Sequence, residues 1–113
     1  MTARLVGIPK PLTFRDEDLR RAVAQLECMN CGVWHWTQAA HANYGKGGAQ
    51  KASDAAIAAL CSDRPGVRGC HALLDQGGVL PKAERRVFEM EMVAKTYIAL
   101  MERGLLRVEK CRS

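Results

Sequence analysis

The first periodic pattern of apolar positions falls in residues 15–27. Its apolar residues recur at the three-to-four-residue spacing of a helix, and they are Leu19, Ala22, Val23 and Leu26. Thr13 followed by Asp16 has the chemistry of a helix cap. The pattern therefore predicts an amphipathic helix that ends at Cys28. Before it, residues 1–12 contain two prolines and no periodic pattern, which predicts an extended N-terminal arm.

The strongest helical pattern follows Pro81 and continues to Gly104. One stripe of this segment is apolar, and it consists of Val87, Met90, Ala94, Ile98 and Met101. The charged residues lie mostly off this stripe. Because a methionine-containing stripe on a helix is most often packed in a core, we predict that this face is buried against the rest of the domain.

The segment between the two helices mixes strand-like and turn-like residues. Residues 32–44 are rich in β-branched and aromatic residues, which predicts a strand, and residues 45–54 have the composition of a loop. The apolar run at 55–61 is consistent with a strand or a helix, and residues 70–78 predict a short helix closed by glycines. Together the patterns predict a single small α+β domain over residues 13–113.

The composition describes a small basic chain. It has 113 residues, with 17 lysines and arginines against 12 aspartates and glutamates, and a formal net charge of +5. This balance favours an anionic partner, of which nucleic acid is the commonest. No apolar run approaches the roughly 20 residues that span a bilayer, and the N-terminus lacks the apolar core of a secretory signal. We therefore predict a cytoplasmic protein without a membrane segment.

Four of the five cysteines predict a structural zinc site. Cys28 and Cys31 form a C-x2-C turn, and Cys61 and Cys70 supply two further thiolates, although the second pair is widely spaced. A reducing cytoplasm favours metal ligands over disulfides, and Cys111 is the unpaired fifth. The alternative is that Cys61 and Cys70 are buried as small apolar residues and that Cys28 and Cys31 are free or partly oxidised thiols. A four-thiolate zinc leaves no open position, so its role is folding.

The histidines are candidates for catalysis. His71 and Asp75 lie four positions apart in the predicted helix 70–78, so both can bind one Mg²⁺, Mn²⁺ or Zn²⁺ ion. A pair of this kind is more often a surface hydrogen bond. His41, at the end of the predicted strand, is a candidate general base, and Asn43 on the same strand face can orient it or contact the metal. Alternatively, His41 is a partly buried polar side chain.

Two loop regions carry side chains suited to contacts with a ligand or with the core. The "GKGG" stretch lacks the spacing of a P-loop or dinucleotide fingerprint, but glycines allow close approach to phosphate, and Lys46 and Lys51 supply positive charge. An ordinary solvated loop is equally consistent with these residues. His35 lies between Trp34 and Trp36, and we predict that the two indoles cover the core or the cysteine turn.

The order of these features resembles the HNH, or ββα-metal, nucleases. A C-x2-C turn is followed by a strand with a histidine, a glycine-rich loop, a short apolar segment ending in cysteine, and a cysteine–histidine pair that opens a helix. Within that group, "AHANYGKGGAQKASD", "AALC" and "CHALLD" are similar to the YbcO-like (DUF1364) family of small phage and prophage nucleases. The resemblance covers roughly residues 28–106.

The resemblance implies a β-hairpin followed by a helix, with a catalytic divalent ion such as Mg²⁺ between them and a zinc knuckle at the base. It implies that His41 activates water and that His71 and Asp75 bind the ion. Asp54 falls near the asparagine position of many HNH proteins, which holds the base in orientation. The lysines of the loop would face the scissile strand.

The sequence therefore predicts a metal-dependent endonuclease that hydrolyses DNA, in an HNH-like α+β domain with flanking N- and C-terminal helices. The alternative is a non-catalytic, zinc-stabilised nucleic-acid-binding module. A third hypothesis is an interaction protein whose long C-terminal helix packs against a partner or a second copy, which would make a dimer.

Overall fold

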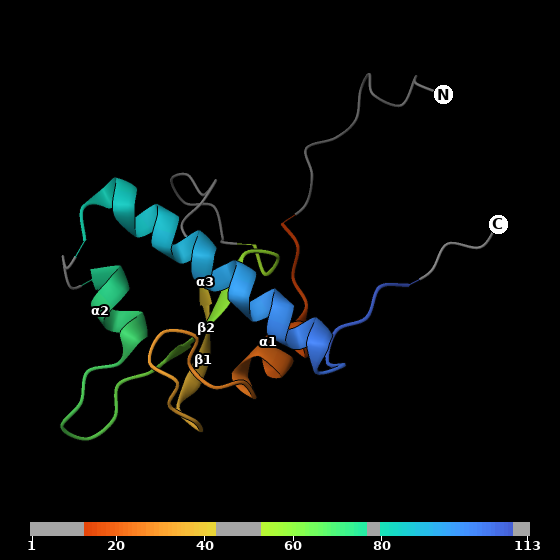
Figure 1. Cartoon of the computed structure of the whole chain (residues 1–113), viewed down its shortest axis with the longest axis horizontal. Helices are drawn as coiled ribbons and strands as arrows, with labels where there is room; N and C mark the ends of the chain where they lie inside the picture. Colours follow the sequence, from red (N-terminus) through yellow and green to blue (C-terminus); the bar gives the residue numbers. More distant parts are fainter. Residues whose placement is uncertain (1–12, 43–52, 77–79, 110–113) are drawn as a thin grey trace, which may run out of the picture.

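The computed structural model describes residues 13–42, 53–76 and 80–109, without the side chains of residues 74–76. It is a small α+β fold with one two-stranded antiparallel sheet. The elements in chain order are α1 (Glu17–Ala24), β1 (Thr37–His41), β2 (Ile57–Cys61), α2 (Cys70–Gln76) and α3 (Lys82–Glu102). Figure 1 shows α3 lying across the hairpin, with α2 near the beginning of α3 and α1 near its end.

The first helix is capped by Asp16, not by the predicted Thr13–Asp16 pair, and it ends earlier than its pattern suggested. Asp16 is the N-cap, because its side chain accepts a hydrogen bond from the Leu19 amide at 3.0 Å, whereas Thr13 lies outside the helix. Val23 and Leu26 are buried, and α1 ends at Ala24. Residues 25–27 therefore lie outside the helix, between α1 and the cysteine turn that begins at Cys28.

The first strand of the hairpin, β1, is shorter than the strand predicted over residues 32–44. Ala39 pairs with Ala59 at its centre, and the pairing runs from Thr37 opposite Cys61 to His41 opposite Ile57. The apolar run that was ambiguous in sequence is a strand, and every residue of β2 is buried. Ala58 and Leu60 belong to one cluster of buried side chains, and Ile57 and Ala59 belong to a second cluster on the other side of the strand. Both faces of β2 are therefore covered.

The prediction for the buried face of α3 is wrong. Val87, Ile98 and Met101 are 71%, 55% and 51% exposed, and Met90 and Ala94 are also exposed. The face that packs on β2 instead carries Met92, Val93, Thr96, Ala99 and Leu100. This face is also largely apolar, but it contains Thr96 and begins with Glu89, whereas the predicted stripe contains no polar residue.

Thr96 explains how a polar residue occupies the core. Its Oγ1 accepts a hydrogen bond from the Ala59 amide of β2 at 2.9 Å and donates to the Met92 carbonyl at 2.7 Å. The hydroxyl is therefore fully used, and it pairs a strand amide that β1 does not reach. Among the described residues, no helix is long and apolar enough to cross a membrane.

Candidate functional site

Four cysteines from separate parts of the fold meet in one cluster. Cys28 and Cys31 lie in the turn after α1, while Cys61 ends β2 and Cys70 begins α2. All four are free thiols, and their Sγ atoms lie within 4.8 Å of one another. The Cys31 and Cys61 Sγ atoms are 3.8 Å apart, about the edge of a tetrahedron with 2.3 Å metal–sulfur bonds. The predicted meeting of these residues is confirmed, and the cluster has the donors and spacing of a structural zinc site.

The turn between Cys28 and Val33 directs the first two thiols. The Cys28 amide donates to the Val33 carbonyl at 2.9 Å, and the Gly32 amide donates to the Cys28 carbonyl at 2.9 Å. Gly32 has a φ of +83°, a left-handed conformation that glycine adopts without a steric penalty. The Cys31 amide then donates to the Cys28 Sγ at 3.4 Å. Both thiols consequently point to the same side of the turn.

The wide gap between Cys61 and Cys70 is a closed loop. Arg64 and Val67 exchange two backbone hydrogen bonds at 3.0 and 2.9 Å, so the intervening residues fold back on themselves. The Cys70 amide donates to the Cys61 Sγ at 3.2 Å. A Cβ on Gly69 would lie 2.3 Å from a backbone carbon just after β2, so glycine is required there. The loop therefore returns the second pair of thiols to one place despite its length.

Ionisation of the thiols is uneven. Burial raises the pKa of Cys28, but hydrogen bonds from the backbone of Cys31, Asn30 and Cys61 outweigh it and bring the pKa to about 7. Burial raises the pKa of Cys70 to about 12, because the hydrogen bond from Asn30 opposes burial only in part and the neighbouring thiols add to it. Deprotonating all four thiols near neutral pH therefore calls for the positive charge that a bound dication supplies.

A second polar centre lies around Asp54, which is completely buried. Its Oδ2 accepts a hydrogen bond from the Asp16 amide at 2.7 Å and pairs with the guanidinium group of Arg20. Its Oδ1 lies 2.7 Å from Nε2 of His41 and 3.9 Å from the guanidinium group of Arg15. The carboxylate therefore joins the end of β1 to the start of α1.

The charge of Asp54 determines which nitrogen of His41 carries the proton. Burial raises the pKa of Asp54, but hydrogen bonds from His41, the Asp16 amide and Arg20 lower it to below its ordinary value. An ionised carboxylate can only accept, so the neutral imidazole carries its hydrogen on Nε2 and a lone pair on Nδ1. No residue in the described part of the chain hydrogen-bonds to Nδ1. This nitrogen can accept a proton from a bound molecule.

His41 and His71 line the same small pocket beside the hairpin. His41 ends β1, His71 lies in the first turn of α2, and Glu89 reaches the pocket from α3. The remaining lining is apolar and consists of Ala40, Ala42, Ala58 and Leu60. Three titratable side chains from three elements therefore converge on a mostly apolar surface, as is common in ligand sites.

A hydrogen bond to Gln38 sets which ring nitrogen of His71 carries the hydrogen. Its Nδ1 lies 2.9 Å from Oε1 of Gln38 on β1, so Nδ1 carries the hydrogen and Nε2 keeps its lone pair. In the described part of the chain, the four cysteines are the only group of three or more metal-binding side chains whose ligand atoms are gathered together. His41, His71 and Glu89 therefore share a pocket without closing around one point.

Glu89 is the pocket residue that sequence reasoning missed. The pattern assigned it to the charged side of α3, yet its side chain is only 9% exposed. It lies on the face that also buries Met92 and Val93. The signal was its three-residue spacing before Met92, which becomes informative only when the buried face of the helix is known.

Several predicted site residues lie outside the described part of the structure. Asp75 is in α2, one turn after His71, but its side chain is not described. The predicted N-terminal arm at 1–12 also lies outside the described residues. The same holds for Asn43, Lys46, Lys51 and Cys111.

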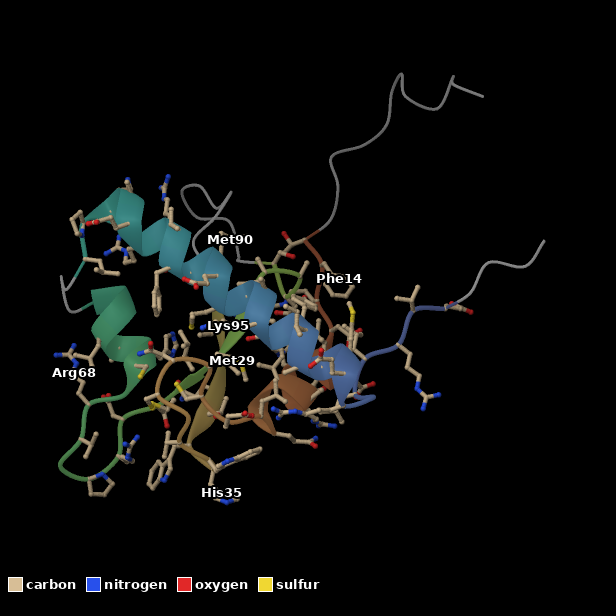
Figure 2. All side chains as sticks on the ribbon, viewed as in Figure 1. Phe14, Met29, His35, Arg68, Met90 and Lys95 are labelled. Atoms are coloured by element: carbon tan, nitrogen blue, oxygen red, sulfur yellow. The ribbon has the colours of Figure 1, made fainter. Side chains whose placement is uncertain are left out.

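The two tryptophans do not cover the core. Trp34 and Trp36 are 49% and 40% exposed and belong to neither cluster of buried side chains, so the prediction that they cover the core is wrong, and the alternative that they cover the cysteine turn stays a prediction. His35 between them has a φ of +75°, an uncommon conformation for a residue other than glycine, and Figure 2 shows it at the edge of the molecule. The guanidinium carbon of Arg103 lies 5.9 Å from the centre of the Trp34 ring. This loop is an exposed aromatic surface.

No protein-family model, curated protein or solved structure matches this chain.

Proposed function

We propose that this protein is a metal-dependent endonuclease of the HNH, or ββα-metal, type that hydrolyses phosphodiester bonds in DNA. The observation that carries the proposal is the pocket shared by His41 and His71. A histidine at the end of the first strand of a hairpin and a histidine in the first turn of the following helix face one space. This is the arrangement that the sequence resemblance implies for the base and the metal ligand.

His41 has the chemistry of the general base in this proposal. Asp54 holds its Nε2–H, so Nδ1 is directed to take the proton of an attacking water. Arg20 and Arg15 also contact Asp54, which keeps the carboxylate charged while the imidazole gains its proton. Asp54 acts through His41 and is therefore a positioning residue.

The donor set of the pocket suits a hard or borderline divalent cation. Within the pocket His71 offers Nε2 and Glu89 supplies a carboxylate from α3. Asp75, the second ligand that the resemblance implies, lies one turn after His71 in α2. A divalent ion bound there would neutralise charge that develops on the scissile phosphate. The formal net charge of +5 favours a polyanionic substrate. Contacts to the phosphate backbone of DNA are the same for every base sequence, so we expect little sequence specificity.

The second candidate function is a zinc-stabilised nucleic-acid-binding module without turnover. The observation that favours it is that only the four cysteines gather as metal ligands among the described residues. The exposed Trp34 and Trp36 suit stacking with unpaired bases, which needs no second metal ion.

The test is nicking of supercoiled plasmid by the zinc-loaded full chain in Mg²⁺ or Mn²⁺. His41→Gln keeps a donor toward Asp54 but cannot act as a base, and we expect a loss of at least about 100-fold in rate. His41→Ala should abolish nicking with zinc content unchanged. His35→Ala is the matched control, because His35 is exposed and lies outside the pocket.

Two results would count against the endonuclease. Equal nicking by wild type and His41→Gln would mean a contaminant or a different base. Binding of DNA without cleavage in Mg²⁺, Mn²⁺ or Zn²⁺ would favour the binding module.

A further inference from the structure

The four cysteines of the cluster differ in their access to solvent. Cys28 and Cys61 are each 1% exposed and Cys70 is 7% exposed, so the fold covers these three side chains. Cys31 is the exposed member of the cluster. With a dication bound all four sulfur atoms are thiolates, so ionisation does not distinguish them and accessibility does. A reagent from solvent therefore reaches the sulfur of Cys31 first.

The turn explains why Cys31 is exposed while Cys28 is not. Cys28 belongs to a buried cluster on the hairpin, and its amide and carbonyl are both used in backbone hydrogen bonds. Cys31 follows Asn30 and precedes Gly32, and both of these neighbours are exposed. A Cβ built on Gly32 would meet no atom of the described chain within 4 Å, so the space beside Cys31 is open. A small molecule can approach the cluster from this side.

Cys61 is the cysteine placed to react next. Its Sγ lies 3.8 Å from the Sγ of Cys31. Cys61 is fixed at the end of β2, where the Cys70 amide and the Arg64 guanidinium group donate to its sulfur at 3.2 and 3.7 Å. Disulfides form between cysteines that a fold already holds side by side. A bond between Cys31 and Cys61 therefore needs only a small movement of the two side chains.

We propose that Cys31 is the modification site of the cluster, which hydrogen peroxide oxidises to a sulfenic acid and Cys61 then converts to a disulfide. In the first step the Cys31 thiolate donates an electron pair to one oxygen of the peroxide, the O–O bond breaks, and hydroxide leaves. In the second step the Cys61 thiolate attacks the Cys31 sulfur, an S–S bond forms, and the sulfenic hydroxyl group leaves as a second hydroxide. Each thiolate loses one electron, and the peroxide gains both.

Formation of this disulfide would empty the zinc site. The thiolate is the form of cysteine that binds zinc, and the disulfide leaves only Cys28 and Cys70 as thiolates. Two ligands do not complete a tetrahedral site, so oxidation should release the ion, and reduction in the presence of zinc should restore it. The proposal rests on the four-cysteine zinc site and is independent of whether the protein is an endonuclease.

Limited oxidation of the zinc-loaded full chain tests the proposal in a Cys111→Ser background, which removes the thiol outside the cluster. Hydrogen peroxide is added below one equivalent, zinc release is followed with a chromogenic chelator, and the remaining thiols are alkylated. We expect about one zinc ion released per peroxide consumed. Mass spectrometry should find a disulfide between the tryptic peptides 22–46 and 52–68, and fragmentation should place it at Cys31 and Cys61. Dithiothreitol with added zinc should reverse both changes.

Cys31→His is the matched variant, because histidine keeps a zinc ligand at this exposed position and removes the oxidisable thiolate. It should retain zinc and release it to peroxide at least about tenfold more slowly than the background protein. Limiting N-ethylmaleimide gives a second measurement that needs no variant in the cluster, and it should label Cys31 of the zinc-loaded background protein before the other cysteines.

Three results would overturn the proposal. They are equal rates of zinc release from Cys31→His and the background protein, a first disulfide between any other pair of cysteines, and a first maleimide label on one of the three buried cysteines. Protein that does not bind zinc would refute the site on which the proposal rests.

Discussion

At the scale of single residues, Asp54 has the most consequential environment in the chain. It is buried, charged, and shared by His41, Arg20 and the Asp16 amide. Burial of a carboxylate is tolerated only when such partners replace water. The same contacts that hold the start of α1 against the hairpin therefore also orient the imidazole that lines the pocket.

Asp54→Asn should destabilise the fold by about 2–4 kcal/mol, because it leaves Arg20 and Arg15 without their buried counter-charge. Urea unfolding of the zinc-loaded protein measures the difference. The matched control is Glu17→Gln, which breaks the exposed pair with Arg21 and should change stability by less than about 0.5 kcal/mol. Equal effects of the two substitutions would show that the Asp54 contacts add little.

The contribution of Asp54 should disappear in acid. Burial raises the pKa of Asp54, but its hydrogen bonds lower it to below the unfolded value of 3.8. The stabilisation is therefore complete above the unfolded pKa and is lost as pH falls through the folded pKa. The difference in free energy of unfolding between wild type and Asp54→Asn should shrink below about pH 4. A difference that does not change with pH would contradict this assignment.

At the scale of elements, the sequence located the helices well and their orientations less well. Helical period, the Asp16 cap and Gly104 were enough to place α1 and α3 along the chain. The buried face of α3 was misassigned because the helix carries apolar residues on two sides, and apolar content alone does not say which side packs on the sheet. Thr96 belongs in the core only because its hydroxyl oxygen accepts a hydrogen bond from the Ala59 amide of β2, and one sequence does not reveal that contact.

Thr96→Val should therefore destabilise the protein by about 1–3 kcal/mol, since it leaves the Ala59 amide buried without a partner. Thr37→Val is the matched control, because the buried Thr37 hydroxyl has no hydrogen-bond partner among the described residues. That substitution should be neutral or slightly stabilising. Thermal unfolding of the two variants compares them directly, and an equal loss in both would mean that the hydroxyl of Thr96 is not required.

At the scale of the whole molecule, the cysteine cluster was the most predictable part of the candidate site. The thiol chemistry and the C-x2-C spacing are visible in the sequence, and the structure adds the loop that returns Cys70 to Cys61. The neighbourhood of Asp54 and His41 was implied only by resemblance, and Glu89 was missed. Asp54 meets His41 across the hairpin because of the strand register, and Glu89 reaches the pocket only because α3 packs on β2, and a single sequence reveals neither arrangement.

The zinc site should couple folding to the pocket, because one of its ligands is the residue directly before His71. The cluster joins the turn after α1, the end of β2 and the start of α2. A chain of this size has a total stability on the order of 5–10 kcal/mol, and a structural zinc supplies an amount of that order.

Freshly purified protein should contain one zinc per chain by elemental analysis, and a strong chelator should remove it together with the cooperative unfolding transition. Cys61→Ser should lose the metal, whereas Cys111→Ser should keep it. If the proposed endonuclease activity is present, it should vanish with the zinc and should not return with excess Mg²⁺, since α2 would no longer hold His71 beside His41. Protein that folds cooperatively without zinc, or that loses zinc on substitution of Cys111, would contradict the four-cysteine site.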